Sequence, residues 1–118
     1  MATIEKLILS GSTNGLPTVC TGGTASAQAV PIHTAGSGTS NMDEVWIWAT
    51  NISSTASVLL TIEFGGAAAA QKIVQLINPS ETVAVVPGIP LNNAKAIEAF
   101  ASVVDVVNVF GFVNRITA

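Results

Sequence analysis

The residues of this chain that could support catalysis or bind a metal are few and scattered. The 118-residue sequence contains one histidine, His33, and one cysteine, Cys20. A hydrolytic relay needs an acid beside the histidine, and the acids nearest to His33 in sequence are Asp43 and Glu44. A zinc site needs three or four His, Cys, Asp or Glu ligands, which this set does not supply. We therefore predict no catalytic residue, no metal site and no cofactor, and we expect the protein not to be an enzyme.

Each of these residues has a simpler structural explanation. A histidine beside a strand end or at a subunit contact accounts for His33. Reactive cysteines lie near cations or helix N-termini, and no such neighbour surrounds Cys20, which favours a small buried hydrophobic residue. Glu44 and Glu63 could be cross-strand neighbours, as in a glycosidase pair, but such a site also needs an aromatic-lined cleft in a larger scaffold.

The composition indicates that charged side chains cover only a small part of the surface. Hydrophobic residues make up 49% of the chain and charged residues only 9%, against about 25% charged in an ordinary soluble domain. The longest candidate membrane span, residues 99–113, is shorter than the roughly 20 apolar residues that a spanning helix needs, and it contains Asp105 and Asn108. We therefore expect no membrane partner and a surface partly covered by other subunits, because permanent interfaces are depleted of charge.

The few charges and the N-terminal sequence argue against a nucleic-acid-binding protein and against a signal peptide. The net charge is −3, and the four basic residues are scattered along the chain instead of forming the cluster that phosphate binding requires. We predict no nucleic-acid binding. No basic region precedes an apolar stretch at the N-terminus, so we expect no signal peptide and synthesis in a cytoplasm.

Hydrophobic residues alternate with polar ones through most of the chain, and turn residues separate the runs. This pattern predicts an all-β protein with about eight antiparallel strands in a single β-sandwich domain covering residues 1–118. A jelly roll is the first choice of topology, and an immunoglobulin-like sandwich is the alternative. The expected strands are 4–10, 18–20, 28–34, 44–51, 57–64, 72–77, 82–86, 96–103 and 106–116.

Several local features predict how these strands pair. Residues 44–51 and 57–64 are expected to form a long antiparallel hairpin, and residues 96–103 and 106–116 a second one. Pro31 lacks an N–H group and is placed at a sheet edge or bulge, and Pro87 is expected to end its strand. Gly111 lies within the last strand and indicates a bulge or a close neighbour.

Trp46 and Trp48 are the candidate binding residues. Both project from the face opposite to Val45 and Ile47, beside Glu44. They could be buried within the domain, they could anchor a protein interface, in which tryptophan is enriched, or they could stack on sugars. Ile4 and Leu7, from the first apolar run, are further interface candidates. Residues 1–6 are a candidate N-terminal arm for reaching a neighbouring subunit, because chain ends stay loose unless tied down.

Five segments resemble small virion proteins of tailed bacteriophages, of the capsid decoration (cement) or head-attachment kind. They are residues 43–51, 60–66, 85–91, 99–101 and 111–116. The resemblance implies a β-rich protein that forms trimers on the capsid surface, binds the major capsid protein and reinforces the shell. Two alternatives remain: a carbohydrate-binding jelly roll that uses Trp46 and Trp48, and a tail or fibre component of the virion.

Overall fold

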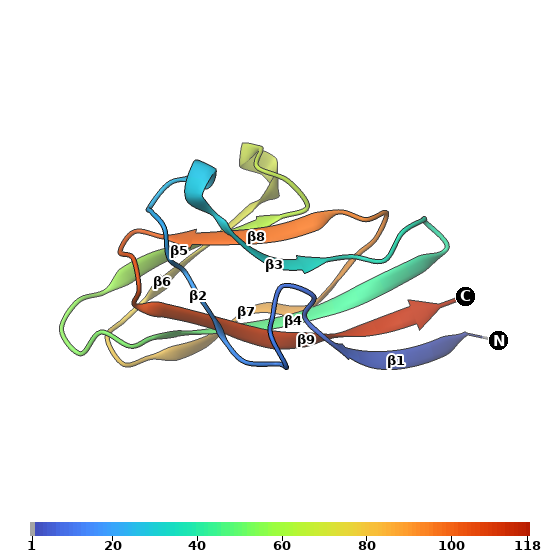
Figure 1. Ribbon diagram of the computed structural model, residues 1–118, viewed down its shortest axis with the longest axis horizontal. Helices are drawn as coiled ribbons and strands as arrows, with labels where there is room; N and C mark the ends of the chain where they lie inside the picture. The colour runs from blue at the N-terminus through green and yellow to red at the C-terminus, as the bar shows by residue number, and fades with distance from the viewer. Residues whose placement is uncertain (1) are drawn as a thin grey trace.

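Nine strands and two short 3-10 helices are the regular elements of the computed structural model, which describes residues 2–118 (Figure 1). The strands are β1 (Thr3–Ile8), β2 (Thr18–Val19), β3 (Val30–Thr34), β4 (Asn41–Asn51), β5 (Val58–Phe64), β6 (Lys72–Ile77), β7 (Thr82–Leu91), β8 (Ala96–Ala101) and β9 (Val107–Thr117). The helices are η1 (Ser26–Gln28) and η2 (Ala69–Gln71). The expected strand-dominated, single-domain sandwich is therefore confirmed.

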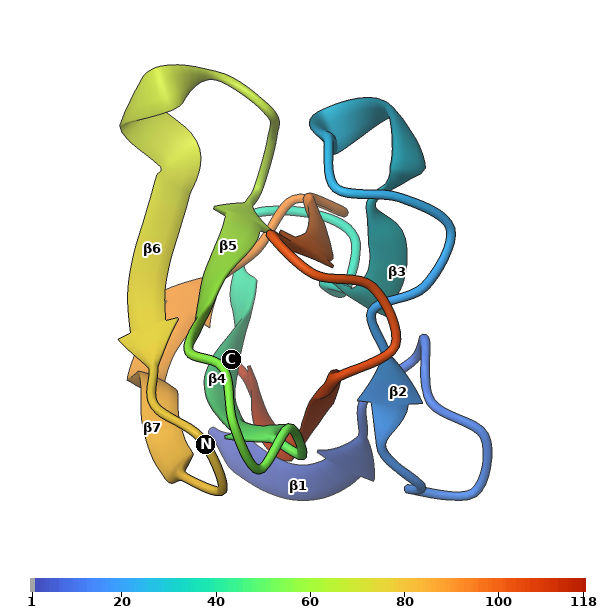
Figure 2. The same cartoon turned by 90° about the vertical axis from the view of Figure 1, so that its left-hand side faces the viewer.

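Two antiparallel sheets face each other, as the end-on view in Figure 2 shows. The five-stranded sheet has the order β1-β9-β4-β7, with β2 also paired to β9, and the four-stranded sheet has the order β3-β8-β5-β6. The strands pair in a nested way, β1 with β9, β3 with β8, β4 with β7 and β5 with β6. One long hairpin rolled around a core gives this order, which is the jelly-roll topology. Because β1 and β2 follow one another along the same edge of β9, the nine strands fill eight positions.

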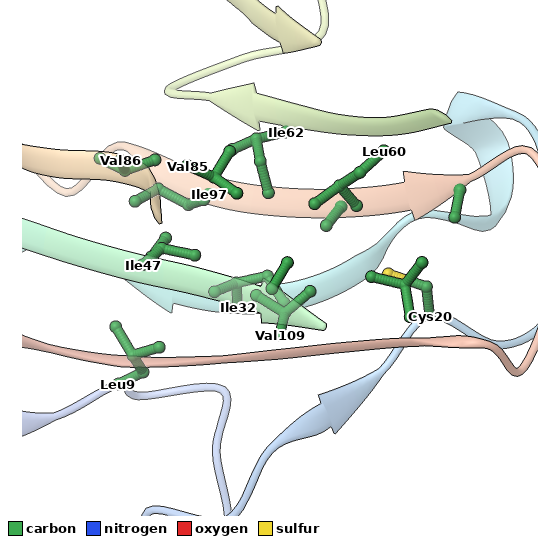
Figure 3. Packing of buried hydrophobic residues seen from close by; sticks show 14 of the residues in the cluster. Leu9, Cys20, Ile32, Ile47, Leu60, Ile62, Val85, Val86, Ile97 and Val109 are labelled. Atoms are coloured by element: carbon green, nitrogen blue, oxygen red, sulfur yellow. The ribbon is translucent and has the colours of Figure 1, made fainter. Parts of the chain in front are cut away.

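The core lies between the sheets and is built from the inward positions of the predicted alternation (Figure 3). Val45, Ile47 and Ala49 of β4 are at most 1% exposed, and Leu60 and Ile62 of β5 are fully buried. Burying an aliphatic side chain of this size stabilises the fold by about 1.5–3 kcal/mol relative to leaving it exposed. Both strands therefore face one core, as their period-two pattern predicted.

Both predicted hairpins are wrong. The strands β4 and β5 lie in different sheets: β4 pairs with β7 and β9, and β5 pairs with β6 and β8. In the same way β8 lies in the four-stranded sheet, and β9 in the five-stranded one. The alternation assigns each side chain to a face, and two strands on opposite sides of one core satisfy it as well as two neighbours do.

The buried side chain of Asn51 helps the chain to cross between the sheets after β4. Its Nδ2 donates hydrogen bonds to the carbonyl oxygens of Ala56, at 2.9 Å, and Ile77, at 3.1 Å. Its Oδ1 accepts a hydrogen bond from the backbone N–H of Ser53. A buried amide must find such partners, because an unsatisfied one costs about 1–3 kcal/mol. The segment between β4 and β5, which the sequence predicted to be the turn of a hairpin, is therefore a crossover between the two sheets.

The prolines behave as edge residues. Pro31 lies on β3, an edge strand whose register shifts between Pro31 and His33, which confirms the predicted edge or bulge. The predicted end of β7 at Pro87 is wrong, because the strand continues to Leu91. As an edge strand, β7 can turn the nitrogen of a proline toward solvent, and a register shift at Gly88, with a φ of +76°, absorbs the irregularity.

Residues Thr3–Lys6 of the candidate arm belong to β1, which is hydrogen-bonded to β9 in register from Thr3 opposite Thr117 to Ile8 opposite Phe112. Met1 lies outside the described residues. The start of β1 and the end of β9 lie at the same end of the sandwich (Figure 1). Among residues 2–118, none of the helices is long and apolar enough to span a membrane.

Candidate functional site: an aromatic face on the five-stranded sheet

Four aromatic side chains form a cluster on the outer face of the five-stranded sheet, which we call the aromatic ladder: Trp46, Trp48, Phe110 and Phe112. Trp46 lies opposite Phe112, and Trp48 lies opposite Phe110, on the neighbouring strands β4 and β9. The ring centroids of the contacting pairs are 6.0–6.4 Å apart, and their planes differ by 15–28°. Offset-stacked pairs of this kind contribute about 0.5–1.5 kcal/mol each beyond their buried area. The ladder is therefore an ordered apolar surface that needs no partner to hold its shape.

The two charged side chains beside the ladder already have partners in the same chain. The Glu44 carboxylate accepts hydrogen bonds from Trp46 Nε1 at 2.8 Å and from Asn114 Nδ2 at 3.1 Å. These bonds, the one from Trp46 first, lower the pKa of Glu44 below its ordinary value. The Lys6 ammonium lies 4.5 Å from the centroid of the Phe112 ring, in cation–π range. These contacts hold both side chains against the outer face of the sheet.

Two glycines make room for Trp46. A Cβ atom on Gly111 would overlap the carbonyl oxygen of Trp46, so the sequence-based expectation of a close neighbour at Gly111 is confirmed. A Cβ atom on Gly88 would lie 2.7 Å from Cζ2 of the Trp46 indole. The backbones of β9 at Gly111 and of β7 at Gly88 therefore lie closer to Trp46 than they could if either position carried a side chain.

A shallow depression of about 420 Å³ lies at one end of the ladder. Its lining residues are Gly15, Trp48, Thr82, Phe110, Gly111 and Phe112. The depression opens on the outer face of the sheet, away from the buried core. It offers aromatic and backbone surface to a ligand, and no charged side chain is part of its lining.

The structure separates the predicted interface residues. Trp46 and Trp48 both belong to the ladder, and Ile4 lies on the same outer face with 70% of its surface exposed. Leu7 points the other way and packs against the core. Sequence reasoning missed Phe110 and Phe112, although Val-Phe-Gly-Phe-Val repeats the pattern of Val-Trp-Ile-Trp-Ala. That shared alternation was the signal that could have found them.

A second cluster, which the sequence did not predict, joins His33, Asp43 and Arg115 at the edge of the core. His33 Nε2 lies 2.7 Å from Asp43 Oδ2, and Arg115 donates from Nε to Asp43 Oδ1 at 2.8 Å and from a terminal nitrogen to Oδ2 at 3.0 Å. Asp43 is 1% exposed. Its burial alone would raise the pKa of the carboxyl, but the hydrogen bonds from Arg115 and His33 and the Arg115 charge outweigh burial and lower it.

Ser10 completes a serine, histidine and aspartate set, but its geometry is not that of a hydrolytic relay. The backbone N–H of Ser10 donates to His33 Nδ1 at 3.0 Å, which leaves the imidazole proton on Nε2, facing Asp43. The Ser10 hydroxyl oxygen accepts from the backbone N–H of Thr34. In a relay the serine hydroxyl is hydrogen-bonded to one imidazole nitrogen and the aspartate to the other. The cluster instead ties β3 of one sheet to β4 and β9 of the other.

The other candidate residues for chemistry lie apart from one another. Cys20 is 1% exposed, and burial raises the pKa of its thiol to about 11, which disfavours the reactive thiolate. Glu44 and Glu63 are on the outer faces of different sheets, so the suggested cross-strand pair is wrong. Among the described residues, no group of three His, Cys, Asp or Glu side chains could hold a metal ion.

Comparison with known proteins gives no relative from which a role could be transferred. The sequence matches no family model and no curated protein, and the fold matches no solved structure.

Proposed function

We propose that this chain is a non-enzymatic structural protein of a bacteriophage virion, which self-associates and binds the outside of the capsid to stabilise it. The observation that carries the proposal is the exposed apolar surface on the outer faces of both sheets. Ile4, Ile8 and Met42 are 42–70% exposed on the five-stranded sheet. On the outer face of the four-stranded sheet, Val74 and Leu76 of β6 are 54% and 55% exposed.

This surface is costly for a chain that stays alone in water. Each square ångström of apolar surface removed from water contributes about 25 cal/mol, and lone soluble proteins rarely expose apolar patches beyond a few hundred square ångströms. With 9% charged residues, the chain has few charges to intersperse among its apolar positions. Contact with other protein chains on both outer faces would remove this surface from water. A protein held between its own copies and a larger shell has such contacts.

The topology is compatible with this role without selecting it. Jelly rolls occur in viral capsid proteins and also in carbohydrate-binding lectins. A fold alone does not identify a function. The capsid assignment, the trimer and the binding of the major capsid protein rest on the resemblance to phage decoration proteins, whereas self-association rests on the exposed apolar surface.

Light scattering coupled to size exclusion tests the proposal. We expect a stable homo-oligomer at micromolar concentration, with a trimer giving three times the 12.0 kDa mass of the chain. Purified expanded capsids of the encoding phage, lacking this protein, should bind it saturably and resist heating better once it is bound. A monomer that also fails to bind such capsids would refute the proposal.

The aromatic ladder and its depression make carbohydrate binding the second candidate, and we expect it to fail a direct test. Every ring of the ladder has another ring within 6.4 Å, and Phe112 also carries Lys6, so the ring faces are partly occupied within the chain. The only two tryptophans of the sequence are Trp46 and Trp48. Titration with a panel of mono- and oligosaccharides should therefore leave the tryptophan emission unchanged. A saturable change, abolished by Trp48→Ala, would favour the carbohydrate-binding alternative instead.

A further inference from the structure

We infer that the aromatic ladder is the surface through which copies of this chain contact one another. The outer face of the five-stranded sheet would then pack against the same face of other copies. This inference rests on the proposed self-association and adds to it the surface that mediates it. It concerns the outer face alone, and both a two-fold pair and three sandwiches around a common axis can bury that face.

The strand register gives a map of this face. Read across β1, β9 and β4, one row contains Ile4, Ile116 and Met42, and the next contains Lys6, Asn114 and Glu44. The following row contains Ile8, Phe112 and Trp46, and the ladder then continues with Phe110 and Trp48. Ala84 of β7 lies beside Trp48. Apolar side chains thus extend on both sides of a single polar row.

The size of the face suits a stable contact. The molecule measures 50 × 25 × 21 Å, and β4 and β9 run along its long axis (Figure 1). Its broad face therefore has an area on the order of 1,000 Å², and a standard interface buries about 800 Å² per partner. One outer face is enough for one specific contact, without a contribution from the loops.

Charge favours a second copy as the occupant of this face. Among the outward positions of its described strands, only Lys6 and Glu44 are charged, so the face is neutral while the whole chain carries −3. Both charges already have partners within the chain. Two copies therefore meet there without net repulsion, because the charges of Lys6 and Glu44 cancel on each face.

The outer face of the four-stranded sheet is less suited to contact with itself. Glu63 on this face is 2% exposed, and its carboxylate accepts a hydrogen bond from the Ser26 hydroxyl of η1 at 2.6 Å, so the η1 segment already covers part of the face. The segments that carry η1 and η2 also project beyond the sheets on this side (Figure 2).

The decisive variant is Ala84→Lys, with Val74→Lys as its matched control. Ala84 is exposed beside Trp48, so a lysine there adds charge at the edge of the ladder and removes almost no contact within the chain. Val74 is 54% exposed on the outer face of the other sheet. Sedimentation velocity over a dilution series should give a self-association constant at least tenfold weaker for Ala84→Lys, which corresponds to about 1.4 kcal/mol. Val74→Lys should stay close to the wild type.

Tryptophan fluorescence supplies a second readout, because both tryptophans belong to the ladder. Acrylamide should quench the wild-type emission more strongly on dilution, as copies separate, and should quench Ala84→Lys strongly at every concentration. Thermal unfolding followed by circular dichroism checks that the variants are folded. If Ala84→Lys unfolds, Ile8→Lys, opposite Phe112, takes its place, since Ile8 is 55% exposed.

The outcomes separate the inference from the proposed function. A wild-type protein that is monomeric at all concentrations would refute the self-association and this inference together. Self-association that survives Ala84→Lys and Ile8→Lys would leave the proposed function intact and refute the inference. Intact self-association combined with lost capsid binding in Ala84→Lys would assign the aromatic ladder to the shell and not to a second copy.

Discussion

Replacing Asp43 with asparagine should lower the free energy of unfolding by about 3 kcal/mol, the lower end of the cost of breaking a buried ion pair. Asp43 is 1% exposed and receives hydrogen bonds from both His33 and Arg115. An asparagine would direct its NH2 group at one of these donors, and the Arg115 charge would lose its counterion. The cost should stay at the lower end because the Arg115 side chain, 32% exposed, can turn to water. Urea denaturation gives the measurement.

Asp105→Asn is the matched control for this change. Asp105 lies in the exposed turn before β9 with a φ of +65°, a conformation that asparagine also tolerates. The same chemical substitution there should change the free energy of unfolding by less than about 0.5 kcal/mol. Equal effects of the two substitutions would show that the buried cluster does not stabilise the fold.

The pH dependence of the Asp43→Asn effect follows from the direction of the pKa shift. The folded state holds the pKa of Asp43 below its ordinary value of 3.8, so the unfolded chain takes up the proton first as the pH falls. The stability contributed by Asp43 is therefore complete above about pH 5 and is lost as the pH falls through the folded-state pKa. The difference in unfolding free energy between wild type and Asp43→Asn should shrink as the pH falls below 4. A difference that grows toward acid pH would contradict the assigned ion pair.

The sequence predicted which side of a strand each side chain occupies better than it predicted which strands pair with each other. In β4 the alternation correctly placed Val45 and Ile47 inward and Trp46 and Trp48 outward, because the side-chain period of a strand is two. It could not show that β5 crosses to the opposite sheet. That choice depends on rolling the whole chain into nested pairs such as β1 with β9, and on local bonds such as those of Asn51.

The candidate site was predictable in part for the same reason. Trp46 and Trp48 stood out as two large rings on one strand face. Their partners Phe110 and Phe112 come from a strand 62–66 positions later, and only the register of β4 on β9 brings the four rings together. The pairing of Asp43 with Arg115 spans 72 positions, and no local pattern marks either residue as a partner of the other.

Among substitutions of a single glycine by alanine, we expect Gly111→Ala to lower the free energy of unfolding the most. Its Cβ would overlap the carbonyl oxygen of Trp46 on the neighbouring strand β4, which carries the two tryptophans of the aromatic ladder. Because the obstacle is backbone and not a flexible side chain, β4 and β9 must separate locally to accept Gly111→Ala. We expect a loss of about 3 kcal/mol in the free energy of unfolding, the upper end of the usual cost of overpacking.

Gly38→Ala separates this steric effect from the general cost of replacing a glycine. Gly38 has a φ of +83°, and no atom lies within 4 Å of the position its Cβ would take, so only backbone strain of about 1 kcal/mol is expected there. Gly111→Ala should also shift the tryptophan emission of the folded protein, because moving β4 away from β9 separates the indoles of Trp46 and Trp48 from the phenyl rings. Gly38→Ala should leave the emission unchanged. Equal stability losses without an emission change would show that the close approach of Gly111 to Trp46 does not position the ladder.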